Sequence, residues 1–242
     1  VMNLKNVLKW YAVDKEYIEY LRRYDNKVQY INYGGKFKPY VWIILNISNF
    51  DYYIPISSIG KNKRKLDKYT NMKEDVDLFK IYDRNNILLS VLNINNMIPV
   101  SLENIEKVNY KNIEKYRTFE STESKKMYIY LLQIELLYLS KNVDKILKKS
   151  TKLYHHKQDM PLSNISVRTC DFKKLEEKCI EYKKVQTLLL KLKYINSKEQ
   201  LYYIYDNLDD KSKFEKVVSI FDSENKRNNI LNFSKEEINN IC

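Results

Sequence analysis

The spacing of the apolar residues changes once along the 242-residue chain, near position 122. Before this point they form short runs rich in β-branched and aromatic side chains, several alternating with polar residues, which is typical of strands. After it they recur every three to four residues, which is typical of helices. The change predicts an α+β fold in which helices surround a small, compact and strongly curved antiparallel sheet.

Local signals place the individual elements. We expect strands at 8–13, 39–47, 52–59, 76–82, 87–92 and 97–100, with turns at 48–51 and 83–86. Pro55 has no amide hydrogen, so it indicates an edge strand or a bulge in the third strand. Residues 60–74 have the composition of a basic loop. Helices are expected from the cap Asp14 to 24, at 122–141 and 143–156, and after the cap Asp171.

Positive charge is concentrated in the first three quarters of the chain. Lys and Arg number 43 against 31 Asp and Glu, a formal net charge of +12. Residues 186–242 hold nine basic and nine acidic side chains, so residues 1–185 carry the whole surplus. This division predicts a working domain at 1–185 and a helical extension at 186–242. A basic domain favours a polyanionic partner such as nucleic acid, although the codons of an A/T-rich genome would also raise the charge.

Several kinds of site are excluded by the residues that the sequence lacks. Its three glycines, Gly34, Gly35 and Gly60, fit neither spacing of a phosphate-binding loop. The cysteines, Cys170, Cys179 and Cys242, contain no C-x-x-C pair, so we expect no zinc site. The histidines have no acidic partner at metal-ligand spacing either, so we expect no metal and no cofactor. Because no apolar run reaches membrane-spanning length and no signal-peptide core is seen, we expect a cytoplasmic protein without membrane contact.

Hydroxyl and ammonium groups gather around one strand end. Ser57 and Ser58 lie at the end of the expected strand at 52–59, Lys61 follows them, and Lys38 precedes the strand before. Hydroxyls can donate to the non-bridging oxygens of a phosphodiester, and ammonium groups offset the charge that develops there. An ordinary strand end followed by a solvated loop would contain the same residues, so their pattern alone leaves both interpretations open.

The two histidines do not suit acid–base catalysis on a phosphate. His155 and His156 are neighbours in a helix, so their side chains diverge by about 100° and cannot flank one phosphate. Tyrosines, in contrast, are interleaved with the cations and could stack on unpaired bases. Of these we expect Tyr30 and Tyr33 to have that role. The interleaved tyrosines are Tyr17, Tyr30, Tyr33, Tyr40, Tyr69, Tyr116 and Tyr128.

An ordered set of short motifs resembles the ToxN/AbiQ family, the toxins of type III toxin–antitoxin systems and of some abortive-infection systems. The resemblance covers about residues 8–185. Its motifs are 10–14 (WYAVD), 17–21 (YIEYL), 38–41 (KPYV), 54–58 (IPISS), 78–81 (LFKI), 92–100 (LNINNMIPV), 116–119 (YRTF), 131–135 (LLQIE) and 170–176 (CDFKKLE).

The resemblance implies a metal-independent endoribonuclease with a sheet similar to that of the Kid/MazF toxins. It also implies inhibition by an RNA antitoxin folded as a pseudoknot, whose repeat-containing precursor the toxin cuts. Toxin and product RNA would then form a closed hetero-oligomer. Free toxin would cut cellular and phage RNA at A-rich single-stranded sites, and this activity would serve in phage defence by abortive infection.

Carried over residue by residue, the resemblance assigns the family's catalytic lysine to Lys38 and its hydroxyl pair to Ser57 and Ser58, with Ser58 the more important. Its loop tyrosine corresponds to Tyr33, with Tyr30 as the alternative, and its loop lysine to Lys61, with Lys63 as the alternative. The sequence lacks the proline that the family often has before that lysine. RNA contacts are expected from Tyr30, Lys36, Lys63, Arg64, Lys65 and Tyr128.

These residues suit a reaction in which the ribose 2′-OH attacks the adjacent phosphorus, leaving a 2′,3′-cyclic phosphate and a 5′-OH. The reaction needs alignment and charge stabilisation but no enzyme nucleophile. Ser58 and Ser57 would position the reacting groups, Lys38 and Lys61 would hold the phosphorane oxygens, and Lys61 or Tyr33 would supply the leaving-group proton. The alternative functions are a non-catalytic basic RNA-binding module and a DNA-binding repressor, for which no helix-turn-helix spacing is seen.

Overall fold

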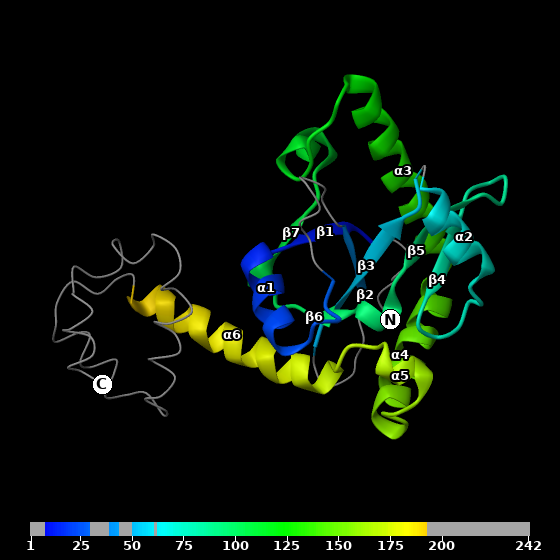
Figure 1. Cartoon of the computed structure of the whole chain (residues 1–242). Coiled ribbons are helices and arrows are strands. Elements are labelled where there is room, and N and C mark those ends of the chain that lie inside the picture. Colours follow the sequence, from blue (N-terminus) through cyan, green and yellow to red (C-terminus); the bar gives the residue numbers. More distant parts are fainter. Residues whose placement is uncertain (1–7, 30–38, 44–49, 61, 193–242) are drawn as a thin grey trace. The chain divides into compact units, whose positions relative to one another are not determined.

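The computed structural model describes residues 8–29, 39–43, 50–60 and 62–192. The chain divides into two units, residues 1–179 and 180–242. The first unit contains an antiparallel sheet with helices around it (Figure 1), which confirms the predicted α+β fold. The predicted helical extension at 186–242 falls outside the described residues after position 192.

Seven strands among the described residues form the sheet, in the order β4-β5-β3-β2-β1-β7, with β6 pairing beside part of β3. Six of them confirm predicted strands. The seventh, β7, was missed because it has only three residues, two of them charged and exposed. The strands are β1 Trp10–Val13, β2 Tyr40–Ile43, β3 Tyr52–Ser58, β4 Phe79–Tyr82, β5 Leu88–Leu92, β6 Ile98–Pro99 and β7 Ile105–Lys107.

Pro55 lies in a central strand, so the prediction of an edge strand or a bulge was wrong. Along one edge β3 pairs with β2 in continuous register, with Tyr40 opposite Pro55. Along the other edge, β6 pairs with Tyr52 and Tyr53, and β5 pairs with the residues from Ile56 onward. Pro55 is therefore at the point where β3 changes partner and no ladder needs its missing amide hydrogen. Its carbonyl still accepts the backbone N–H of Asn93, at 3.0 Å.

The helices begin at the predicted caps. Asp14 accepts the backbone N–H of Tyr17 at 2.9 Å, and Asp171 accepts that of Lys174 at 3.2 Å. Three 3-10 turns, η2 Ile94–Asn96, η3 Leu102–Asn104 and η4 Tyr110–Lys115, lie between β5 and the long helices. The α-helices are α1 Lys15–Tyr24, α2 Lys63–Asn71, α3 Thr122–Lys141, α4 Val143–Asp159, α5 Asn164–Val167 and α6 Phe172–Leu192.

The basic segment predicted as a loop contains the helix α2. Asn62 caps it by accepting the backbone N–H of Lys65 at 3.0 Å, and its residues include no Gly or Pro. Tyr69 packs with Met72 against a cluster of buried apolar residues beside β5. The prediction failed because α2 has no buried residue, so its sequence lacks the apolar stripe by which helices are recognised.

A buried carboxylate fixes β3 against two helices. Glu176 of α6 accepts hydrogen bonds from the hydroxyls of Tyr52 in β3 and Tyr154 in α4, at 2.7 and 2.6 Å. The ring of Tyr154 is stacked on Phe172, with centroids 5.6 Å apart and an interplanar angle of 7°. These contacts fix the start of β3 to α4 and α6, and the strand carries the two serines at its other end.

Candidate active site

Ser57 is hydrogen-bonded within the protein. It lies opposite Val91 of β5, on the face of the sheet where Tyr69 of α2 packs. Its hydroxyl oxygen accepts the side-chain amide of Asn93 at 3.0 Å. Burial raises the pKa of Tyr69, and a hydrogen bond with Ser57 partly offsets that rise. The Ser57 hydroxyl is thus held by neighbours of the same chain.

Ser58 points to the other face, because consecutive strand residues alternate. It lies opposite Ser90 of β5, which neighbours Glu135 of α3. The side chain of Ser58 is half-buried, and its hydroxyl makes no hydrogen bond to a described residue. The sequence suggested that the two hydroxyls would bind one phosphate together, but their surroundings differ. Of the two, only the Ser58 hydroxyl has no hydrogen-bond partner among the described residues and can bind an external group.

A sharp turn brings positive charge close to Ser58. Gly60 has a φ of +56°, a left-handed conformation that favours glycine, and it leads from β3 to the cap of α2 within four residues. The first turn of α2 then presents Lys63, Arg64 and Lys65, all exposed, with no acidic residue. A helix N-terminus already has partial positive charge. This end of the sheet therefore favours an anion.

The structure tests only part of the predicted site. Ser57, Ser58 and the cations of α2 follow one another along one connection, as the sequence suggested. The positions of the other predicted residues are outside the described part of the chain, so their roles stay predictions. These residues are Tyr30, Tyr33, Lys36, Lys38 and Lys61.

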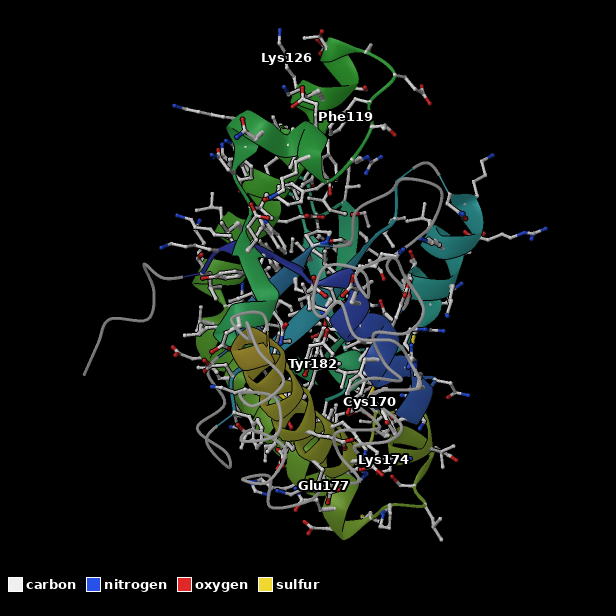
Figure 2. The ribbon with its side chains drawn as sticks, turned by 90° about the vertical axis from the view of Figure 1, so that its left-hand side faces the viewer. Phe119, Lys126, Cys170, Lys174, Glu177 and Tyr182 are labelled. Carbon is white, nitrogen blue, oxygen red and sulfur yellow. The ribbon has the colours of Figure 1, made fainter. Side chains whose placement is uncertain are left out.

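Tyr128 lies at the start of α3 and is 9% exposed. The guanidinium of Arg117 lies over its ring, 4.4 Å from the centroid. Phe119, labelled in Figure 2, packs against the same ring at 5.7 Å. Burial raises the pKa of the Tyr128 hydroxyl to about 12, although Arg117 opposes the rise. Its RNA contact stays a prediction, and Arg117 covers the ring that stacking would use.

Sequence reasoning assigned no role to a buried carboxyl group behind Ser58. Glu135 is fully buried, and neither of its oxygens has a hydrogen-bond partner of good geometry among the described residues. Burial raises its pKa to about 8, while the neighbouring Ser90 hydroxyl lowers it. Glu135 could have been noticed in the sequence as a carboxyl group among the apolar residues of a predicted helix. Asn93, in the run 92–100, is a second residue without an assigned role.

The described residues offer little for a metal or for histidine chemistry. Among them, no group of three or more His, Cys, Asp or Glu side chains could hold a metal ion. His155 is exposed, and His156 interacts with Ser163 at 2.8 Å through its Nε2 in the last turn of α4. No helix among the residues that the structure describes is both long and apolar enough to cross a membrane.

Comparison with known proteins gives one consistent family. A family model described as toxin ToxN of type III toxin–antitoxin systems matches residues 9–180. The endoribonuclease ToxN of Bacillus thuringiensis subsp. kurstaki is 32% identical over 191 residues, which are 75% of this chain and 88% of that protein.

Two solved structures are also similar. One concerns a type III toxin selectively inhibited by a non-coding RNA pseudoknot; it is 28% identical, with a TM-score of 0.59, and the match covers 74% of this chain and 99% of that one. The other is the lactococcal anti-phage endoribonuclease AbiQ, also 28% identical, with a TM-score of 0.58 and the same coverage. The predicted likeness to the Kid/MazF toxins is not tested by these matches and stays a prediction.

Proposed function

The chain belongs to the ToxN toxin family of type III toxin–antitoxin systems, whose relatives are endoribonucleases, and from this premise we propose that it cuts single-stranded RNA without a metal ion. The observation that supports this most is the Ser58 hydroxyl. It is half-buried at a strand end and makes no hydrogen bond to another described residue. The cation-rich start of α2 follows within five residues.

The reaction that suits this site is an internal transesterification. The 2′-oxygen bonds to the adjacent phosphorus, the bond from phosphorus to the 5′-oxygen breaks, and the proton lost by the 2′-OH is balanced by one gained at the 5′-oxygen. The products are a 2′,3′-cyclic phosphate and a 5′-OH. Charge on the pentacoordinate phosphorus has to be offset by fixed donors and cations.

Within this proposal Ser58 donates to a phosphate oxygen or aligns the 2′-OH. It does not act as the base, because a serine hydroxyl stays protonated at neutral pH. Ser57 has a positioning role, since Asn93 and Tyr69 already hold its hydroxyl. Lys38 and Lys61 would stabilise the phosphorane oxygens, and Lys61 or Tyr33 would protonate the leaving oxygen. Lys63, Arg64 and Lys65 would hold flanking phosphates.

The biological substrates follow from the family. We propose that a pseudoknot RNA antitoxin inhibits this chain, that the chain processes the repeat-containing precursor, and that toxin and RNA form a closed hetero-oligomer. A solved relative that is inhibited by such a pseudoknot supports the first point. Free toxin would cut A-rich cellular and phage RNA, and the anti-phage activity of the AbiQ relative supports a defence role.

Cleavage of an A-rich RNA by the purified full chain, with and without EDTA, tests the proposal. Ser58→Ala should lower the rate by roughly 10²–10³-fold, the usual effect of losing one transition-state donor. Ser140→Ala is the matched control, because Ser140 is also half-buried and makes no hydrogen bond to another described residue, but lies near the end of α3.

The parental chain and the control should cleave equally fast, keep their activity in EDTA and leave cyclic phosphate ends. A Ser58→Ala variant with the parental rate would show that this is not the active site. Binding of RNA without any product would instead indicate the non-catalytic RNA-binding module.

A further inference from the structure

Three lysines share the exposed side of α4. Lys145, Lys148 and Lys152 are spaced by three and four residues, so their side chains follow one another along the helix, about 5–6 Å apart at Cβ. All three are exposed, and none forms an ion pair with a described residue. We call these three residues the basic face of α4. The buried side of the helix is formed by Val143, Ile146, Ser150, Leu153 and Tyr154.

A fourth lysine of the helix has a different, structural role. The Lys149 ammonium group pairs with the Glu74 carboxylate at 2.7 Å and donates to the carbonyls of Asp75 and Leu78, at 2.8 and 3.1 Å. These contacts fix α4 to the segment that leads into β4. The basic face is therefore carried by a helix whose position on the sheet is set.

One end of the basic face, at Lys145, lies two strands away from the strand that carries Ser58. The Lys145 ammonium group is 5.4 Å from the ring centroid of Phe79 in β4. Phe79 pairs with Leu92 of β5, which pairs with Ile56 of β3. Ile56 and Ser58 share a sheet face, and neighbouring strands are about 4.8 Å apart, so β4 lies about 10 Å from β3. An RNA strand that leaves Ser58 across β5 and β4 would meet Lys145 first, and α4 continues from there to Tyr154, whose ring contacts Tyr52 at the other end of β3.

We propose that the basic face of α4 binds the sugar-phosphate backbone of the RNA substrate, outside the point of cleavage. The inference rests on the proposed function and deepens it by adding a second contact surface. Lysine ammonium groups are point charges that neutralise phosphates without reading bases. The face therefore adds affinity for longer RNA irrespective of sequence, while a short RNA that fills only the site at Ser58 gains nothing.

Binding of two A-rich single strands, a 5-mer and a 20-mer, tests this in the Ser58→Ala background. The variant is K145Q/K148Q/K152Q. Each phosphate neutralised on a single strand contributes about 0.7 to the slope of log K against log salt. The slope for the 20-mer should fall by roughly 2, that for the 5-mer should not change, and the thermal midpoint should equal that of the parent.

The matched control is K111Q/K126Q/K174Q, which removes the same charge from three exposed lysines on separate elements; Figure 2 shows Lys126 at the start of α3 and Lys174 on α6. It should keep the slope for both probes. Equal loss of slope in the two triple variants would overturn the proposal by showing an effect of net charge alone, and an unchanged slope in the α4 variant would overturn it directly.

Cleavage assays keep this proposal separable from the proposed function. With Ser58 restored, the α4 variant should cleave the 5-mer at the parental rate. If the parental chain cleaves neither probe but the α4 variant still loses slope on the 20-mer, the basic face stands as an RNA contact and the nuclease function fails.

Discussion

At the scale of single residues, two adjacent serines have unlike surroundings. Asn93 is the residue that creates the difference, because its side-chain amide donates to Ser57 and to the carbonyls of Pro55 and Val91, at 3.0, 3.3 and 3.3 Å. It is 7% exposed, so these bonds are shielded from water. Asn93 therefore holds the end of β3 and decides which hydroxyl is left for a ligand.

Replacing Asn93 tests this role. Asn93→Ala leaves the buried carbonyl of Val91 and the Ser57 hydroxyl with fewer donors, so it should lower the free energy of unfolding by about 1–3 kcal/mol. Denaturant titration measures the loss. Asn95→Ala, in the same run, removes one contact to the Arg168 carbonyl and should cost less. Equal losses in the two variants would contradict the assigned role.

Glu135 should make the stability depend on pH. Burial raises the pKa of the folded chain's carboxyl from 4.5 to about 8, so the folded state favours the neutral acid. The unfolded chain loses this proton near pH 4.5, and the folded chain only near pH 8. Stability from this group is therefore complete below about pH 4.5 and falls by about 1.4 kcal/mol per pH unit until about pH 8.

The variant Glu135→Gln should remove this dependence. We expect the free energy of unfolding of the variant, measured by denaturant titration from pH 5 to 9, to increase relative to that of the parent as the pH rises. Glu177→Gln is the control, since Glu177 is an exposed residue of α6, as Figure 2 shows. Parallel pH profiles for the parent and Glu135→Gln would contradict the prediction.

At the scale of elements, α2 combines an unfavourable charge pattern with the RNA-binding role proposed for it. Lys63, Arg64 and Lys65 occupy its first turn, where cations oppose the helix dipole. Such a helix is better stabilised when an anion lies at its N-terminus. Lys68, in the last turn, has the favourable position and lies 5.3 Å from the ring centroid of Tyr69.

Neutralising the first turn should have two opposite effects. K63Q/R64Q/K65Q should stabilise the free protein by a few tenths of a kcal/mol per residue, because the clash with the dipole is relieved. The same change should weaken RNA binding and lower its salt slope by up to about 2. Thermal unfolding and binding titrations measure the two effects. Lys68→Gln should not raise the thermal midpoint, and a stabilised midpoint there would contradict the explanation.

The sequence predicted the elements whose pattern is local. Strand alternation and the caps Asp14 and Asp171 placed most strands and helices. It could not predict α2, which lacks a buried stripe, or the central position of Pro55, which depends on the distant strands β5 and β6. The sequence also pointed to the pair Ser57 and Ser58 but did not predict their different surroundings. Those surroundings are formed by β5, α2 and α3, which are distant in the sequence.

At the scale of the whole molecule, charge should dominate RNA affinity. The net charge of +12 comes entirely from residues 1–185. RNA affinity of the full chain should therefore fall steeply with salt, by about 0.7 in log K per tenfold salt for each phosphate neutralised. Titrations between low and moderate salt measure this slope. A flat response would indicate that the positive charge reflects codon composition and not a nucleic-acid partner.

The proline at the partner change of β3 also locks the strand in place. If β3 slid by one position against β5, every side chain would exchange faces, and the serine now beside Asn93 would turn toward Glu135. After such a slip the nitrogen of Pro55, which has no hydrogen to donate, would face a neighbouring strand at a position where a ladder hydrogen bond is needed. The slipped pairing would therefore lose a hydrogen bond and be less stable. Pro55, three residues before Ser58 and without reactive atoms, thereby keeps Ser58 and not Ser57 on the face proposed to bind RNA.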